Sequence, residues 1–166
     1  MKTEGCLIKI LVICVGKIKE KFFSQAVDEY VKRLSRYCKT EIIEVADEKT
    51  PDEASAHEEK LIKKKEGERI LKNIRDDDYV IALAIDGKKY DSVGLAGYLE
   101  KLGIGGTSHI TFVIGGSLGL APEVLERADM KLSFSDMTFP HQLMRVILFE
   151  QIYRCYRIIN NEPYHK

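Results

Sequence analysis

The sequence lacks a net charge and lacks any long uncharged stretch of apolar residues. Its 166 residues include 26 lysines and arginines against 26 aspartates and glutamates, so the chain has no overall positive field with which to capture bare nucleic acid. Any nucleic-acid partner would have to be recognised locally. The most apolar opening segment, residues 7–15, contains Lys9, has no small-residue cleavage site after it and is too short to span a bilayer. We therefore predict a cytoplasmic protein with no membrane partner.

Cysteine is also scarce, and its spacing excludes the common cysteine-based sites. The four cysteines include no CxxC pair and have no cysteine or histidine at zinc-ligand spacing; they are Cys6, Cys14, Cys38 and Cys155. This pattern predicts buried thiols in a reducing compartment, and no metal site. The alternative, a nucleophilic cysteine, has no flanking signature in its favour.

The usual nucleotide-binding motifs are absent as well. No Gly-Lys-Ser or Gly-Lys-Thr occurs, which excludes a P-loop. The glycine loop at Gly115, Gly116 and Gly119 reads GGxxG rather than GxGxxG, follows a late strand and leaves too little chain for the rest of a dinucleotide-binding domain. By itself this loop fits a tight turn as well as a backbone that binds a ligand.

The sequence does contain apolar runs that alternate with segments of helical spacing. The strands are expected at 7–15, 40–46, 79–85, 111–114 and 131–133, and the helices at 19–37, 55–75, 95–102, 122–127 and 141–159. This order predicts a single α/β domain over residues 1–166, with an open, mostly parallel sheet and helices on both of its faces. In helix 55–75 the lysines are interleaved with glutamates, which favours a solvated face over a phosphate-binding one.

The last expected helix, 141–159, is apolar nearly all round. A helix of this kind needs a second packing partner besides the sheet, and a homodimer would provide one. Its polar residues Arg145 and Glu150 either form structural ion pairs or belong to a functional site.

Three segments follow strands at the carboxyl edge of the expected sheet, where open α/β sheets bind ligands: residues 86–89, 115–120 and 133–141. The chain then ends in a polar tail with Tyr164 and His165, at a place where chains usually fray. These segments and the tail are the candidate functional regions.

The run FVIGGSLGL, followed by LSFSDMTFPHQLMRVILFEQIYR and a terminal PYHK, resembles the RlmH family of 23S ribosomal RNA pseudouridine methyltransferases, in the SPOUT superfamily. The likeness extends over nearly the whole chain, and the C-terminal third is its most specific part. The resemblance implies that the first six residues are an extra stretch, because the family's start would normally fall close to Leu7.

The resemblance implies a SPOUT fold with a C-terminal trefoil knot, an exception to the rule that chains do not thread loops. It also implies a homodimer in which the cofactor pocket of one subunit meets the tail of the other. The cofactor is S-adenosyl-L-methionine, and the chemistry requires no metal. The residues implied to bind it are Leu83, Gly115, Phe134, Ser135, Asp136, Met137, Thr138 and Phe139.

The implied reaction is methylation of N3 of a pseudouridine in 23S ribosomal RNA, on the assembled 70S ribosome. This imide nitrogen must lose its proton, which calls for a base or for a group that stabilises the anion. We expect His165 to accept the proton, Arg145 to stabilise the charge and Tyr164 to contact the nucleobase, while Arg154 and Lys166 contact phosphate. The alternatives are a SPOUT enzyme for another RNA and a non-catalytic ribosome-binding factor.

Overall fold

The computed structural model describes residues 7–166 and contains one five-stranded sheet. Every pair of neighbouring strands is parallel, in the order β2-β1-β4-β3-β5. The strands are β1 (Lys9–Val15), β2 (Lys39–Val45), β3 (Tyr79–Lys89), β4 (His109–Ile114) and β5 (Met130–Ser133), and the helices are α1 (Lys21–Leu34), α2 (Ala56–Leu71), α3 (Ser92–Ile104), α4 (Pro122–Arg127) and α5 (His141–Ile159). The α/β prediction is confirmed, while the trefoil knot stays a prediction.

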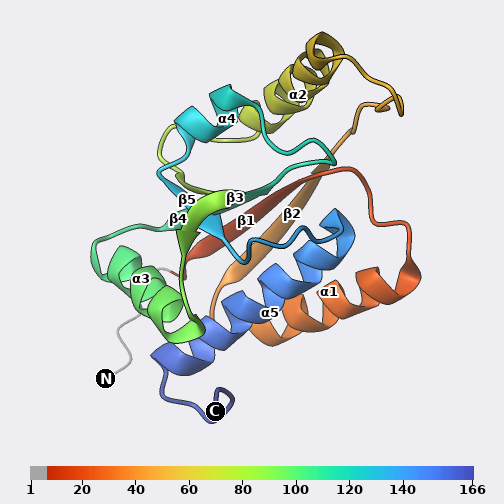
Figure 1. The fold of residues 1–166 in the computed structure, drawn as a ribbon. Coiled ribbons are helices and arrows are strands. Elements are labelled where there is room, and N and C mark those ends of the chain that lie inside the picture. Colours follow the sequence, from red (N-terminus) through yellow and green to blue (C-terminus); the bar gives the residue numbers. More distant parts are fainter. Residues whose placement is uncertain (1–6) are drawn as a thin grey trace.

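Helices cover both faces of the sheet, and each face has its own apolar core (Figure 1). Alternate residues of β1 supply the two cores: Ile10 and Val12 face the larger one, Ile13 and Val15 the smaller. The larger core lies under α1, α3 and α5, and the smaller one under α2 and α4. Because both faces are covered, the central strands β1 and β4 are nearly continuous apolar runs, as is usual for parallel sheets.

Helix α5 begins and ends where the sequence predicts. Leu148, Phe149 and Ile152 are fully buried, and α5 packs against both α1 and α3 of the same chain (Figure 1). Most of its apolar surface therefore has partners inside the chain. A homodimer stays a prediction, and it rests on the family resemblance more than on the composition of this helix.

Strand β3 is longer than predicted. Its ladder with β5 is interrupted after Leu83 and resumes at Lys88, so both residues pair with Leu132. Between them Gly87 lies against β5 so closely that a Cβ would be 2.8 Å from the carbonyl oxygen of Lys131. The expected loop at 86–89 is thus part of an irregular strand. The sequence did not predict this part of β3 because its residues are mostly polar. In residues 7–166, no helix has the length and apolarity needed to cross a membrane.

Candidate active site

A cavity of about 660 Å³ lies at the carboxyl ends of β4 and β5 and beside the middle of β3, where the pairing of β3 with β4 has ended. This volume is in the range of small-molecule sites. Of the three candidate segments, 115–120 and 133–141 contribute to its wall, whereas 86–89 does not, because those residues continue β3. The lining residues are Leu83, Ala84, Ile85, Ile114, Gly115, Gly116, Ser117, Leu118, Gly119, Phe134, Ser135, Met137, Thr138, Phe139, Pro140, His141 and Met144. Every residue predicted to bind the cofactor is among them except Asp136.

The cavity wall is mainly apolar with exposed backbone. Leu83, Phe134 and Phe139 supply apolar surface, and Met137 leaves 74% of its surface exposed. The Ser135 hydroxyl accepts a hydrogen bond from the backbone N–H of Met137 at 3.0 Å. This contact shapes the loop that follows β5, within the candidate segment 133–141, which we call the third loop. Such a wall suits a flat aromatic base that is recognised by a few backbone hydrogen bonds.

Asp136 belongs to the same loop but is directed elsewhere. Its side chain is 80% exposed, and its carboxylate pairs with the Lys89 ammonium at 2.6 Å. This contact ties the third loop to the end of β3. It supports an indirect role for Asp136, which shapes the loop without lining the cavity.

The glycine loop is both a tight turn and a wall of the cavity. Gly116 and Gly119 pair across the turn, and Gly119 has a φ of +83° that side-chain-bearing residues rarely adopt. A Cβ on Gly115 would lie 2.9 Å from the carbonyl carbon of Gly119. The two interpretations that the sequence left open are therefore compatible.

Two residues of the first turns of α5, His141 and Met144, also line the cavity. His141 is the last residue of the candidate segment 133–141 but was not singled out as a binding residue, and Met144 lies beyond that segment and was missed. Burial, together with the positive charge of Arg145, lowers the pKa of His141 below its ordinary value. The histidine is therefore neutral at physiological pH.

Arg145 is almost completely buried, with 1% of its surface exposed, and does not line the cavity. Its Nη1 lies 2.6 Å from the Glu44 carboxylate, and its Nη2 donates to the carbonyl oxygen of Gly16 at 2.6 Å. The same carboxylate accepts from the backbone N–H of Ile18. Burial acts to raise the pKa of Glu44, but these hydrogen bonds outweigh it and the net shift is downward. Arg145 thus fixes the segment after β1 to α5.

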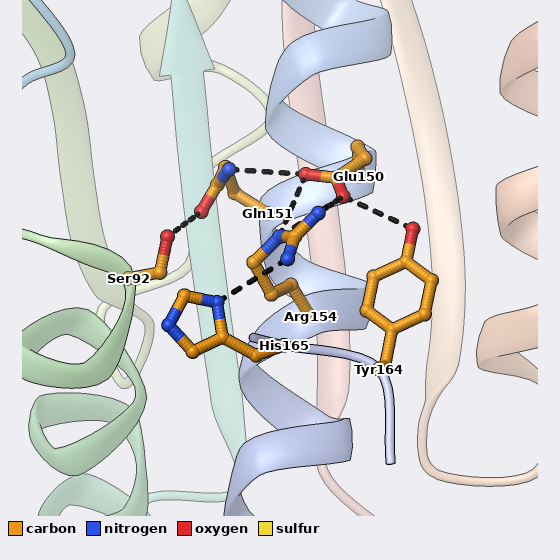
Figure 2. A network of polar contacts seen from close by, with 6 residues as sticks. All are labelled: Ser92, Glu150, Gln151, Arg154, Tyr164 and His165. Atoms are coloured by element: carbon orange, nitrogen blue, oxygen red, sulfur yellow. Dashed lines mark hydrogen bonds and ion pairs between the residues drawn. The ribbon is translucent and has the colours of Figure 1, made fainter.

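Glu150 is the centre of a second polar cluster, near the C-terminus (Figure 2). Its carboxylate accepts hydrogen bonds from the Arg154 guanidinium at 2.5 Å and from the Tyr164 hydroxyl at 3.1 Å. The guanidinium also lies over the Tyr164 ring, 4.7 Å from its centroid. Burial and the hydrogen bond to Glu150 raise the pKa of Tyr164 to about 12. The tail is therefore anchored rather than frayed, with a Tyr164 hydroxyl that keeps its proton.

His165 joins this cluster through Arg154, whose Nη1 lies 3.3 Å from its Nδ1 (Figure 2). Because a guanidinium can only donate hydrogen bonds, Nδ1 is the acceptor, and a neutral ring carries its proton on Nε2. On the other side of Glu150, Gln151 links the cluster to Ser92 of α3.

The cavity and the tail cluster lie at different places along α5. From Met144, in the cavity wall, to Arg154, in the tail cluster, the helix advances about 15 Å. The structure brings Tyr164 and His165 together, but it does not bring them to the cavity of their own chain or to Arg145.

Comparison with known proteins agrees with this architecture. The family described as "Predicted SPOUT methyltransferase" matches residues 8–165. A ribosomal RNA large subunit methyltransferase H from Bifidobacterium adolescentis is 64% identical over 96% of this chain and all of that protein. The chain belongs to this family of SPOUT methyltransferases. A second member, ribosomal RNA large subunit methyltransferase H 1 from Clostridium perfringens, is 61% identical over the same shares.

The fold of this SPOUT methyltransferase also matches a solved structure. A probable methylase family protein from Haemophilus influenzae has a TM-score of 0.51 and 16% identity, over 96% of this chain and 70% of that one. At this identity the likeness concerns the fold alone. The family resemblance and the prediction of a methyltransferase are both confirmed by the sequence matches.

Proposed function

We propose that this SPOUT methyltransferase uses S-adenosyl-L-methionine to methylate N3 of a pseudouridine in the 23S RNA of the assembled 70S ribosome. The observation that carries the proposal is full-length identity of 64% to a protein named ribosomal RNA large subunit methyltransferase H. The net charge of zero of this chain supports a folded ribosomal surface as the substrate in preference to naked RNA. From this proposed substrate we infer that the protein works in the cytoplasm.

The cavity suits the cofactor in size and in chemistry. Leu83, Met137 and Phe139 offer apolar surface for adenine, and the backbone of the glycine loop is accessible because Gly115 and Gly119 have no side chains. The bound cofactor supplies an electrophilic methyl group. The protein then has to align the acceptor nitrogen and exclude water.

The tail cluster supplies the groups for the nucleobase. With Nδ1 held by Arg154, the Nε2–H of His165 can donate to a carbonyl oxygen of the pseudouridine. This hydrogen bond from His165 stabilises the imide anion that forms when N3 loses its proton to water. Arg154 adds positive charge next to the nucleobase. We therefore assign to Arg154 the stabilisation of the anion that the sequence analysis expected of Arg145. The alternative role of His165, as the proton acceptor, requires the contact with Arg154 to break.

Two replacements separate these roles of His165. His165→Gln keeps an N–H donor but no basic nitrogen, whereas His165→Ala keeps neither. If His165 is a donor, the glutamine variant should retain at least about ten times the turnover of the alanine variant. Equal losses in both variants, with cofactor affinity unchanged, would support proton abstraction instead.

The distance of about 15 Å along α5 between cavity and tail supports a homodimer with shared sites. In this arrangement the tail of one subunit faces the cavity of the other. The exposed side chains of Ile85 and Met137 at the cavity are apolar surface that a partner subunit would cover.

Methyl transfer from labelled S-adenosylmethionine tests the proposal directly. The substrates are 70S ribosomes, separated subunits and naked 23S RNA, each with and without the pseudouridine. We expect label at one position of the 23S RNA in 70S ribosomes that contain the pseudouridine. Label confined to another RNA would point to a different SPOUT specificity, and the absence of label in every substrate to a ribosome-binding factor.

A further inference from the structure

His141 has an unusual setting for a histidine in a cavity wall. Its Nδ1 is buried and has no hydrogen-bond partner within residues 7–166, and the Nε of Arg145 shares both properties. The two residues are four apart on α5 and so lie on the same helix face. No hydrogen bond joins the two side chains within the described residues, although the Arg145 charge is near enough to lower the pKa of His141.

This setting determines where the imidazole carries its proton. Burial lowers the pKa of His141, the charges of Arg145 and Lys19 lower it further, and Asp47 opposes them. The neutral ring has one proton, and the guanidinium disfavours a second donor at Nδ1. The proton is therefore assigned to Nε2, the ring nitrogen that is not among the buried atoms without a partner, and His141 can offer the cavity that it lines an uncharged hydrogen-bond donor.

The backbone around His141 favours an anion at the same end of the cavity. Helix α5 begins after Pro140 with no side-chain cap and no acidic residue in its first turn. Its first N–H groups have no acceptor within the helix and give it a partial positive charge. The Pro140 and His141 side chains at this helix end line the cavity.

We propose that His141 is a cofactor-contacting residue, which donates a hydrogen bond from Nε2 to the α-carboxylate of the methionine part of S-adenosylmethionine. The contact rests on the proposed function, in which this cavity holds the cofactor. The carboxylate is the anionic group of that molecule, and the adenine fits the apolar surface of Leu83 and Phe139. A neutral donor also avoids placing a second cation beside the sulfonium.

A thermodynamic cycle tests the contact without any activity measurement. Calorimetric titration gives the affinities of S-adenosylmethionine and of its decarboxylated form, which keeps the sulfonium and the amine, for the wild type and for His141→Ala. We expect the replacement to weaken S-adenosylmethionine binding about tenfold or more. Binding of the decarboxylated form should change less than about twofold, because the interaction is already absent. His141→Gln, which keeps a donor, should recover part of the lost affinity.

Thermal unfolding of the three proteins shows whether the variants remain folded. Equal weakening of both ligands by His141→Ala, or no weakening of either, would overturn the contact while leaving the cofactor pocket in place. A folded wild type that binds neither ligand would overturn the assignment of the pocket itself, and with it the proposed function.

Discussion

Subunit complementation offers the sharpest test of how the cavity and the tail act together. In one variant, His165→Ala removes the tail group but leaves the cavity. In the other, Gly115→Val damages the cavity, because even a Cβ at this position would come within 2.9 Å of the Gly119 backbone. If the protein is the proposed homodimer, each variant alone should lose roughly a hundredfold or more of its turnover, since each lacks one half of every site.

The structure sets the expected recovery when the two variants are mixed. Reacting atoms must approach to about 3 to 3.5 Å, whereas the tail cluster lies about 15 Å along α5 from the cavity of its own chain. If sites form between subunits, each mixed dimer has one intact site. Random pairing makes about half of the dimers mixed, so a mixture should reach about one quarter of wild-type turnover.

The assay is labelled methyl transfer to 70S ribosomes after the variants are unfolded and refolded together, or are produced in the same cells. The two variants refolded separately and then combined are the control for exchange. A co-refolded mixture that is no more active than this control, although size analysis shows mixed dimers, would refute sites shared between subunits. Full activity of His165→Ala by itself would remove the tail from the site.

Three further predictions concern paired or buried groups elsewhere in the protein and in its tail. Glu44→Ala leaves the Arg145 charge buried without its partner, and should lower the free energy of unfolding, measured by chemical denaturation, by about 2 to 3 kcal/mol. The loss is smaller than for a fully buried pair because the Glu44 side chain is 35% exposed. Since folding lowers the pKa of Glu44, the pair stabilises the protein at neutral pH, and this contribution should be lost as the pH falls below about 4.5; an unchanged acid dependence in the variant would contradict it. Glu150→Gln should loosen the tail and reduce turnover about a hundredfold while cofactor affinity changes little, and a matching loss of affinity would refute this separation. In a Cys6→Ser background, a thiol reagent at pH 8 should modify none of the other cysteines until the protein unfolds, because burial raises the pKa of Cys14, Cys38 and Cys155 to about 12.

The sequence was sufficient to predict the elements whose signals are local. Helices α4 and α5 have the predicted bounds, because Pro122 marks the first turn of one and Pro140 precedes the other. Strands β1 and β4 and the first part of β3 were found as apolar runs, since both faces of the sheet are covered. The end of β3 was missed, because its last residues are polar and owe their strand geometry to pairing with β5.

The cavity was predictable in part and the polar contacts were not. The rule for the carboxyl ends of parallel strands, together with the family resemblance, located two segments that line it, 115–120 and 133–141, but was wrong for 86–89, which belongs to β3. The partner of Arg145 lies 101 positions away in the sequence, at Glu44. An ion pair over that separation has no periodic pattern. The link between Asp136 and Lys89 was hidden for the same reason.

Helix α5 unites these observations, because in the proposed arrangement it takes part in both halves of the site. It begins in the cavity wall with His141, is held to the segment after β1 by Arg145, and carries Glu150 and Arg154, which anchor the tail. Its apolar sides are packed against the sheet, α1 and α3, so it has little freedom to bend. In a dimer such a helix fixes the cofactor end and the nucleobase end of the sites relative to each other. In that arrangement the partly buried pair between Arg145 and Glu44 would position both ends through α5.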